Sequence, residues 1–452
     1  MAQSGADELV FAPLGGLGEI GMNAALYGFG PEGRKKWILV DCGISFAGDE
    51  LPGVEIILPD LTFIEQRRKD LLGIVITHAH EDHIGALVDL WPQLRAPVYA
   101  TRFSTGLLEI RKLQESNTPK LQIVTVAAGV PFALGPFACE FVNVAHSIPE
   151  SNALIVRTPL GNIVHTGDWK IDPTPVIGAP TDEARFKAIG DEGVLALICD
   201  STNVLRDGIS PSEADVARTL RDIIDKSSHR VVVTTFASNV ARMRAVAEAA
   251  EAANRQVAIV GRAMDRVEQV SRELGLLDGL KPFLGPDALQ RLPRNKVVAL
   301  LTGSQGEPRA AMARVAIDDH PDISLAAGDR VIFSSRAIPG NEKSVNRILN
   351  NLVKAGVEVI TDRTHLVHVS GHPRLEELKR MYEWVRPKIA VPAHGEALHL
   401  TEHAAFAKAQ GVPHVLRAFN GAMVRLAPGV AEIVDHVRSG RRLKDGELLI
   451  DV

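Results

Sequence analysis

The sequence predicts an α/β protein in which a strand-rich section is interrupted by a section of alternating strands and helices. Three observations lead to this fold class. Up to about residue 205 the chain shows short strands and turns with few helices, and from about 210 strands and helices alternate. After about 365 the chain returns to polar residues of the first kind, with a strand predicted near 389–392. The β/α alternation of the middle section is typical of a domain built on a parallel sheet.

The length and composition describe an ordinary globular chain. With 452 residues it exceeds a typical single domain, so more than one structural unit is expected. A hydrophobic content of 46% and a charged content of 23% fit a protein with a large core. The net charge of -5 offers no overall attraction for polyanions. Contact with a nucleic acid would therefore need a local basic groove.

The cysteines and the apolar runs indicate a cytoplasmic protein with no membrane partner. Cys42, Cys139 and Cys199 are far apart and form no CxxC pair. Each lies in an apolar context, which favours reduced, buried thiols over a disulfide framework or a thiolate zinc site. The first residues lack the basic start and apolar core of a secretion signal, and no apolar run approaches membrane-spanning length.

In the first section, short apolar runs bounded by turn residues predict strands, and helical spacing of apolar residues predicts helices. Strands are expected at residues 9–13, 23–28, 37–42, 73–77, 98–100, 137–144, 153–158, 161–166 and 194–200. Helices are expected at residues 84–91 and 102–114.

In the middle section, the first predicted helix is 211–226, with Ser210 as its opening residue and Pro211 at its first position. Strands are expected at residues 231–235, 257–260, 297–302 and 331–334. Helices are expected between them at residues 239–254 and 264–274.

A glycine-rich segment at residues 16–21, Gly-Leu-Gly-Glu-Ile-Gly, matches the dinucleotide-binding pattern, and Asp41 follows at a suitable distance. That pattern requires a helix directly after the glycines. Residues 22–29 look instead like a second strand, so the segment is predicted to be a hairpin turn. Asp41 ends the following strand, where it can either cap a turn or accept the free ring N–H of a metal-bound histidine.

Directly after the predicted strand at 73–77, four side chains that can bind a metal lie within six residues: His78, His80, Asp82 and His83. A buried structural histidine usually occurs alone, whereas this density predicts two cations held side by side. His78 and His80 are two apart and can point to one side of a short extended segment. Asp82 and His83 can then face a second ion. The alternative is a solvated polar turn.

Two ions need further ligands, including a carboxylate that bridges them, and three strand-end residues can supply these: His146, Asp168 and His394. Each of them alone would be a structural or surface residue more often than a ligand. His165 is the rival of Asp168. Asp168 is favoured because one carboxylate oxygen can bridge two cations and a neutral imidazole cannot.

The order of these ligands resembles that of the metallo-β-lactamase fold. The middle insertion, Asp200-Ser201-Thr202-Asn203 before it and Ser370-Gly371-His372 after it resemble the β-CASP nuclease subgroup. The segments 15–23, 368–372 and 392–396 are most similar to the bacterial ribonuclease J family. The resemblance implies an αββα sandwich with an inserted parallel-sheet α/β domain.

The implied domains are a first metallo-β-lactamase part at 1–207, the β-CASP domain at 208–364, and a second metallo-β-lactamase part with a C-terminal linker at 365–452. The family usually continues into a small C-terminal domain, which we expect to be absent from this chain. The resemblance leaves a homodimer or an RNA-decay complex open as the assembly.

The resemblance also implies roles for the ligand-type residues. One zinc ion would be held by His78, His80 and His146, the other by Asp82, His83 and His394, with Asp168 bridging. The catalytic residues would be Asp82, Asp168, Asp200 and His372. We expect His372 to contact the phosphate and to protonate the leaving oxygen. Manganese is the alternative to zinc, since sites of mixed nitrogen and oxygen ligands accept both.

A phosphate site is predicted where the strand ending near Thr235 meets the next helix. Free backbone N–H groups there, with Ser238 and Asn239 as donors, suit an anion. The alternative is helix capping alone. Residues 301–307 form a similar segment, and Arg262 and Arg336 are further phosphate candidates. The family resemblance implies a pocket for a 5′-monophosphate, which we place at Ser238, Asn239, His368, Val369, Ser370, Gly371 and His372.

We therefore expect a two-metal ribonuclease acting on single-stranded RNA, in RNA maturation and decay. It would be a 5′-to-3′ exonuclease on 5′-monophosphorylated RNA, with endonucleolytic cutting as a second mode. One alternative is a tRNA-processing or small-substrate hydrolase of the same fold. The other is a non-catalytic RNA-binding subunit, which the presence of every expected metal ligand argues against.

Overall fold

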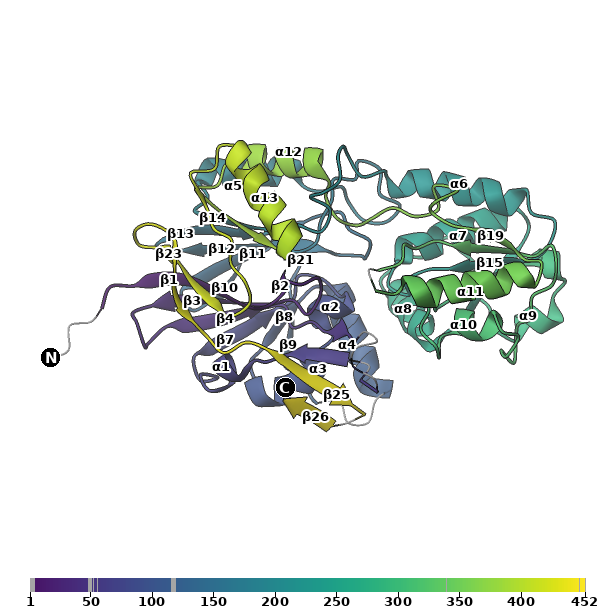
Figure 1. Ribbon diagram of the computed structural model, residues 1–452, viewed down its shortest axis with the longest axis horizontal. Coiled ribbons are helices and arrows are strands. Elements are labelled where there is room, and N and C mark those ends of the chain that lie inside the picture. The colour runs from purple at the N-terminus through teal and green to yellow at the C-terminus, as the bar shows by residue number, and fades with distance from the viewer. Residues whose placement is uncertain are drawn as a thin grey trace.

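The computed structural model describes residues 5–47, 51, 53–54, 56–114, 119–338, 340–446 and 448–451. Two lobes lie side by side (Figure 1). The larger lobe holds both the first and the last described strands, and the smaller lobe is formed by the middle of the chain.

Two mixed sheets form the centre of the larger lobe. The first has the strand order β24 (Glu432–His436), β23 (Ala422–Ala427), β1 (Glu8–Gly15), β3 (Ala24–Gly30), β4 (Lys36–Val40), β7 (Leu71–Val75), β8 (Val98–Ala100), β9 (Ile123–Thr125). The second has the order β10 (Phe132–Leu134), β11 (Phe137–Asn143), β12 (Asn152–Thr158), β13 (Gly161–His165), β14 (Ala196–Asp200), β20 (Ile389–Ala393), β22 (His414–Val415). One apolar core fills the space between them, with Phe11 and Tyr27 from the first sheet and Phe141 and Val391 from the second.

Helices cover the outer face of each sheet. On the first sheet these are α1 (Thr62–Glu65) and α3 (Leu87–Leu94), which bury Ile64 and Leu90. On the second they are α5 (Glu183–Glu192), α12 (Leu375–Val385) and α13 (Ala397–Ala409), which bury Phe186 and Met381. This layering of helix, sheet, sheet and helix confirms the predicted αββα sandwich.

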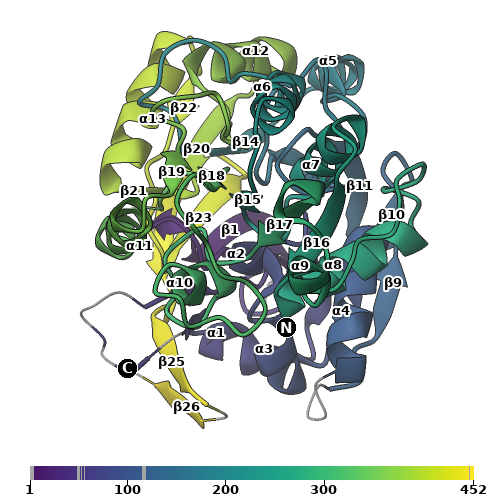
Figure 2. The same cartoon turned by 90° about the vertical axis from the view of Figure 1, so that its right-hand side faces the viewer.

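The smaller lobe is a five-stranded sheet in which every pair of neighbouring strands is parallel. Its strand order is β16 (Gln256–Val260), β17 (Val297–Leu301), β15 (Val231–Thr234), β18 (Arg330–Phe333), β19 (Glu358–Ile360). One face is covered by α6 (Glu213–Asp225), α7 (Val240–Ala252) and α8 (Arg262–Glu273). The other is covered by α9 (Ala288–Arg291), α10 (Ala311–Val315) and α11 (Glu342–Lys354) (Figure 2). The inserted parallel-sheet domain is thus confirmed, while its bounds at 208 and 364 stay a prediction.

The lobes share apolar contacts beside the metal-ligand motif. Helix α4 (Arg102–Gln114) of the larger lobe packs on α8, so that Phe103 and Ile110 join the core of the smaller lobe. A Cβ at Gly106 would lie 2.8 Å from a methyl group of Val270, which shows how closely the two helices approach. Ala79, within the His78–His83 motif, belongs to the same core. The motif therefore lies at the junction of the lobes.

The glycine-rich segment at 16–21 connects the antiparallel strands β1 and β3, as predicted. A Cβ at Gly15 would lie 1.8 Å from the carbonyl oxygen of Met22, so the turn excludes larger residues there. Within it, β2 (Leu17–Gly18) pairs in parallel with β21 (Gly395–Glu396). No helix follows the glycines within the described residues 16–30, which excludes the dinucleotide fingerprint.

A further four-stranded sheet joins the end of the described chain to the larger lobe. Its strand order is β26 (Leu448–Asp451), β25 (Arg441–Asp445), β6 (Ile56–Pro59), β5 (Ser45–Phe46).

No helix in the described parts of the chain is long and apolar enough to span a membrane. Cys42, Cys139 and Cys199 are free and buried, which confirms the prediction of reduced thiols.

Two predicted helix starts are wrong. The helix expected at 211–226 begins at Glu213, because Ser212 and not Ser210 is its cap: Ser212 Oγ accepts from Ala214 N at 3.2 Å. The Ser210 N–H donates instead to Glu377 Oε2 at 2.8 Å. The helix expected at 84–91 is divided into the short α2 (Glu81–Ile84) and α3 (Leu87–Leu94).

Candidate metal centre

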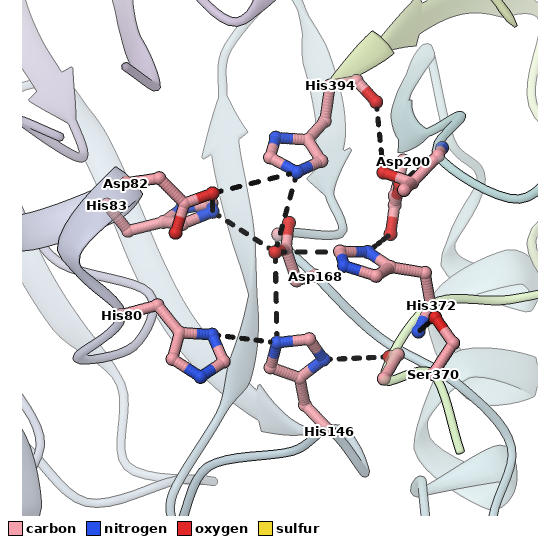
Figure 3. A network of polar contacts seen from close by, with 12 residues as sticks. His80, Asp82, His83, His146, Asp168, Asp200, Ser370, His372 and His394 are labelled. Carbon is pink, nitrogen blue, oxygen red and sulfur yellow. Dashed lines mark hydrogen bonds and ion pairs between the residues drawn. The ribbon is translucent and has the colours of Figure 1, made fainter. Parts of the chain in front are cut away.

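The predicted ligands lie after strand ends, or in the short helix that follows one of them, at one edge of the sandwich. His78 and His80 follow β7, while Asp82 and His83 lie in the first turn of α2. His146 follows β11, Asp168 follows β13 and His394 follows β20. Because β13, β14 and β20 are parallel neighbours, their carboxyl ends bring these residues together (Figure 3).

The first group of ligand atoms comes from His78, His80, His146 and Asp168. His80 Nδ1 lies 3.2 Å from His78 Nε2 and 3.0 Å from His146 Nε2. Asp168 Oδ2 lies 3.8 Å from Nε2 of each of the other two histidines. Three ring nitrogens and one carboxylate oxygen thus converge on one point.

The second group comes from Asp82, His83, His394 and again Asp168. His83 Nε2 lies 3.2 Å from Asp168 Oδ2 and 3.6 Å from Asp82 Oδ2. His394 Nε2 lies 3.7 Å from Asp168 Oδ2 and 3.8 Å from Asp82 Oδ2. The same Asp168 oxygen therefore lies between both groups, which is the geometry of a bridging ligand.

The second nitrogen of four of these histidines has its own partner, which fixes the orientation of the ring. His83 Nδ1 donates to Asp41 Oδ2 at 2.7 Å, and His146 Nδ1 donates to the carbonyl oxygen of Gly371 at 2.7 Å. His394 Nδ1 donates to Asn23 Oδ1 at 2.8 Å. Nε2 of each ring faces the site, where His83 Nε2 also lies 3.0 Å from Asn23 Nδ2.

Thr77 orients the fourth ring, that of His78. Its hydroxyl donates to Asp41 Oδ2 at 2.8 Å and lies 3.0 Å from His78 Nδ1, so the hydroxyl oxygen accepts from that ring. Asp41 also accepts from the Thr77 backbone N–H at 2.8 Å. Asp41 thus contacts one ligand directly and a second through Thr77.

Burial keeps the histidines of the first group neutral, which is the form that binds metals. It lowers the pKa of His80 to about 4 and the pKa values of His78 and His146 well below the ordinary value. Burial also lowers the pKa of His83, but the carboxylates of Asp168, Asp82 and Asp41 raise it by more.

Asp168 is ionised although it is buried. Burial raises its pKa, but His394, His83 and His372 outweigh that effect and hold the pKa well below its usual range. Its Oδ1 atom is buried without a hydrogen-bond partner, and so is His394 Nε2. Buried polar atoms rarely stay unpaired, so these orphaned atoms and the mixed nitrogen and oxygen donors fit a pair of divalent cations.

His372 and Asp200 adjoin the second group. His372 Nδ1 lies 2.7 Å from Asp200 Oδ2 and 3.9 Å from Asp168 Oδ2, and its ring stacks on His394 with centroids 5.5 Å apart. Burial lowers the pKa of His372, but Asp200 and Asp168 raise it to about 9. A protonated imidazole with a side chain that is 19% exposed can donate a proton to a bound molecule.

The loop 368–372 lies against the same centre. The amide nitrogen of Asn203 donates to Ser370 Oγ at 2.8 Å and to the His372 carbonyl at 3.1 Å. His368 Nδ1 is buried without a partner, and burial lowers the pKa of that ring well below its ordinary value. Val369 is buried in the core of the smaller lobe. The loop thus offers small and polar groups next to His372.

The other predicted phosphate segment lies in the smaller lobe. Ser238 is partly buried in the turn between β15 and α7, and Asn239 caps α7 by accepting from Arg242 N at 2.9 Å. The capping role left open by the sequence is therefore present. It leaves the side-chain nitrogen of Asn239 for another partner.

Several predicted candidates lie apart from the ligand groups. His165 Nδ1 lies 2.8 Å from the Tyr27 hydroxyl and belongs to neither group. Arg262 is exposed at the start of α8, and Arg336 pairs with Asp362 at 3.1 Å. In the segment 301–307, Gln305 Nε2 donates to the Arg336 carbonyl at 2.9 Å.

Sequence reasoning did not assign roles to Asn23 and Thr77. Asn23 also donates from Nδ2 to the Asp82 carbonyl at 3.1 Å, so it contacts a ligand residue on each side of the second group. Asn23 lies at the end of the glycine-rich turn, and this position is the sequence feature that could have indicated a role in the site. Thr77 directly precedes His78, and its hydroxyl could have been considered as a partner for that ring.

Three family models match the chain. They are the beta-lactamase superfamily domain at residues 36–187, the ribonuclease J beta-CASP domain at 228–352 and the Zn-dependent metallo-hydrolase RNA specificity domain at 356–416. A solved protein of unknown function from Enterococcus faecalis V583 shares the fold, with a TM-score of 0.64 at 15% identity, over 92% of this chain and 100% of that chain. Fold and site thus define a metallo-β-lactamase-type hydrolase with a β-CASP insertion.

Sequence comparison identifies the family within this class. The chain is 55% identical over 451 residues to Ribonuclease J of Sinorhizobium meliloti, and the matched region covers 100% of the chain and 80% of that relative. It is 41% identical over 445 residues to Ribonuclease J of Mycolicibacterium smegmatis, over 97% of the chain and 78% of that relative. The chain belongs to the ribonuclease J family.

Proposed function

We propose that this chain hydrolyses phosphodiester bonds of single-stranded RNA with two divalent cations. It works as a 5′-to-3′ exonuclease on 5′-monophosphorylated RNA and cuts internally as a second mode, in RNA maturation and decay. The observation that carries the proposal is the position of Asp168 Oδ2, within 3.8 Å of ligand nitrogens of both groups. Membership of the ribonuclease J family supports RNA as the substrate.

The two groups of ligands are assigned accordingly. His78, His80 and His146 would hold one ion, Asp82, His83 and His394 would hold the other, and Asp168, which belongs to both groups of side chains, would be a ligand of each. Zn²⁺ is the proposed ion, since three imidazoles with one carboxylate form a common zinc environment, and Mn²⁺ is the alternative. When bound, two divalent cations lower the pKa of a water and stabilise charge on the phosphate oxygens.

The chain's own residues orient the reactants and move protons. The carboxylates of Asp82 and Asp168 face the point where both groups meet, so they can orient the attacking water and accept its proton. Asp200 engages His372 Nδ1 at 2.7 Å and favours the protonated ring. His372 then donates its Nε2 proton to the leaving oxygen of the cleaved phosphodiester.

The 5′ end is proposed to be recognised between the lobes. Ser238 and Asn239 supply donors at the start of α7, and the loop of His368, Val369, Ser370, Gly371 and His372 supplies the opposite wall. A terminal phosphate held there would place the first phosphodiester bonds of the RNA at a set distance from the two ligand groups, as removal of nucleotides from the 5′ end requires.

Metal content and RNA turnover of wild type and His80→Ala test the two-metal mechanism. Loss of one imidazole should lower the metal content by about one ion per chain and RNA turnover by at least about 100-fold. The matched control is His414→Ala, which removes an exposed histidine of β22. Equal turnover in wild type and His80→Ala would overturn the mechanism.

The substrate is tested with one RNA carrying a label at either end, in 5′-monophosphate, 5′-triphosphate and 5′-hydroxyl forms. We expect mononucleotides from the monophosphorylated form and slower attack on the others. Cleavage of a tRNA precursor or a lactone with no attack on 5′-monophosphorylated RNA would favour a tRNA-processing or small-substrate hydrolase. RNA binding without turnover in the metal-loaded protein would favour a non-catalytic subunit.

We propose that the protein is located in the cytoplasm, because three free, buried cysteines fit a reducing compartment. A homodimer or an RNA-decay complex stays a prediction, which the mass of the protein in solution, alone and with RNA, would test.

A further inference from the structure

The segment from Val367 to His372 is held at each end by a hydrogen bond to one of its carbonyl groups. Near its C-terminal end, the metal-ligand candidate His146 donates to the Gly371 carbonyl at 2.7 Å. At its N-terminal end, Arg242 Nη1 donates to the Val367 carbonyl at 2.8 Å. One contact comes from the metal centre and the other from the smaller lobe. The position of the loop is thus set by both lobes together.

Arg242 is a charged residue with no solvent exposure, at 0%. Its Nη2 atom binds Glu213 Oε2 at 2.9 Å, and Glu213 is itself 4% exposed. Its Nη1 atom also donates to the carbonyl and the hydroxyl of Ser334, and the Ser334 hydroxyl donates to the Val367 carbonyl at 2.7 Å. One guanidinium therefore joins three segments that are far apart in the sequence.

The same residue contacts the other proposed phosphate segment. The Arg242 backbone N–H donates to Asn239 Oδ1 at 2.9 Å, so its main chain fixes the α7 cap while its side chain fixes the loop after Val367. The α7 cap and the loop together form the proposed 5′-phosphate site. Arg242 is therefore placed to set the distance between its two walls.

A second buried ion pair, between Lys170 and Asp172, connects Glu213 to the segment that carries the candidate ligand His146. Asp172 accepts from the Glu213 N–H at 3.0 Å and from Ser212 Oγ at 2.6 Å, and it pairs with Lys170 Nζ at 3.0 Å. Lys170 N donates to the Ala145 carbonyl at 2.8 Å, directly before His146. The contacts thus run from the metal-ligand segments through Asp172 and Glu213 to Arg242.

We propose that Arg242, held by Glu213, is a positioning residue that sets the 5′-phosphate loop against the metal centre. This inference rests on the proposed function and adds a determinant of 5′-end specificity outside the ligand groups. A planar guanidinium can bind a carboxylate and two carbonyls at once, whereas a lysine ammonium cannot reproduce that geometry. Arg242→Lys should therefore keep the charge and release the loop.

Arg230→Lys is the matched control. Arg230 lies in the same lobe, is 3% exposed, and donates to the carbonyls of Ser324 and Leu289 at 3.1 and 2.6 Å. It precedes β15, whereas the α7 cap follows that strand, so the two arginines lie at opposite ends of the sheet. Glu213→Gln is the second test variant, because it keeps the side-chain shape and removes the ion pair.

Hydrogen exchange of the metal-loaded proteins tests the loop position directly. Amides of residues 367–372 should exchange at least about tenfold faster in Arg242→Lys, and also faster in Glu213→Gln, than in wild type or Arg230→Lys. Unchanged exchange in both test variants would overturn the proposal. An equal increase in Arg230→Lys would overturn it too, because the effect would then be general loss of stability.

Kinetics test the consequence for specificity. KM for 5′-monophosphorylated RNA should rise about tenfold in Arg242→Lys, with KM for 5′-hydroxyl RNA and metal content unchanged. A rise in KM for both RNAs, or a fall in kcat alone, would overturn the specificity role. If wild type makes no distinction between the two 5′ ends, the 5′-phosphate part of the proposed function fails, and the exchange result still decides the loop position.

Discussion

The candidate metal centre and the proposed phosphate site both lie at the junction of the lobes, but they are assembled in different ways. In the candidate metal centre, four of the seven proposed ligand residues come from one six-residue motif, and the other three follow β11, β13 and β20 of one sheet. In the proposed phosphate site, Arg242 contacts both segments: its backbone N–H donates to Asn239 of the α7 cap, and its guanidinium donates to the Val367 carbonyl at the start of the loop. The first site takes most of its residues from one short motif, whereas the second depends on contacts between segments that are far apart in the sequence.

The difference teaches which changes each site should tolerate. A bridging ligand belongs to both ions, so its loss should remove both at once. The contact of Arg242 with Val367 positions only the loop, so its loss should alter recognition of the 5′ end and leave the metal in place.

The largest effect is expected for Asp168→Asn, which removes the charge shared by both groups. Metal content should fall by close to both ions, and RNA turnover by at least about a thousandfold. Metal analysis and single-turnover cleavage measure this, with the exposed Asp191→Asn as control. Retention of both ions with turnover near wild type would contradict the bridging role.

The next effect concerns proton transfer. A proton donor must be protonated, so activity should be lost as pH rises through the pKa of His372, which Asp200 raises. Asp200→Asn removes that carboxylate, and the alkaline loss of kcat should therefore move down by about one pH unit or more. A pH profile of kcat measures it. An unmoved alkaline limb would exclude His372 as the donor held by Asp200.

A smaller effect is expected at the oriented histidines. Asp41→Asn weakens the acceptor of His83 Nδ1 and Thr77, so metal affinity should fall by about 10–100-fold while the ligands themselves remain. Competition with a chelator of known affinity measures this. Turnover should recover when the metal is in excess, and failure to recover would mean that Asp41 acts on more than the metal.

The smallest effect is expected in the phosphate site itself. Ser238→Ala removes one proposed donor to the terminal phosphate, which should raise KM for 5′-monophosphorylated RNA by about tenfold or less. KM for 5′-hydroxyl RNA serves as the internal control. An equal rise for both RNAs would show that Ser238 contacts RNA elsewhere than at its 5′ end.

Local patterns identified side chains that the structure brings together. The density of imidazoles from His78 to His83 predicted a pair of cations, and the strand-end positions of His146, Asp168 and His394 completed the set. The glycine-rich turn at 16–21 was correctly separated from a dinucleotide motif because the next residues have strand character. The predicted start of the helix near residue 211 was less accurate. Ser210 and Ser212 are both residues that can cap a helix, and the structure distinguishes them because the Ser210 N–H donates to Glu377 while Ser212 caps the helix.

By itself, the sequence determined the α/β class, the insertion and the set of candidate ligand residues that the structure brings together, because strand alternation and the spacing of these residues are properties of short segments. Only the tertiary structure decided that Asn23 orients His394, 371 positions away, and that Arg242 holds Val367, 125 positions away. The reason is physical. A buried polar group needs a partner, but which partner it finds depends on how distant segments pack.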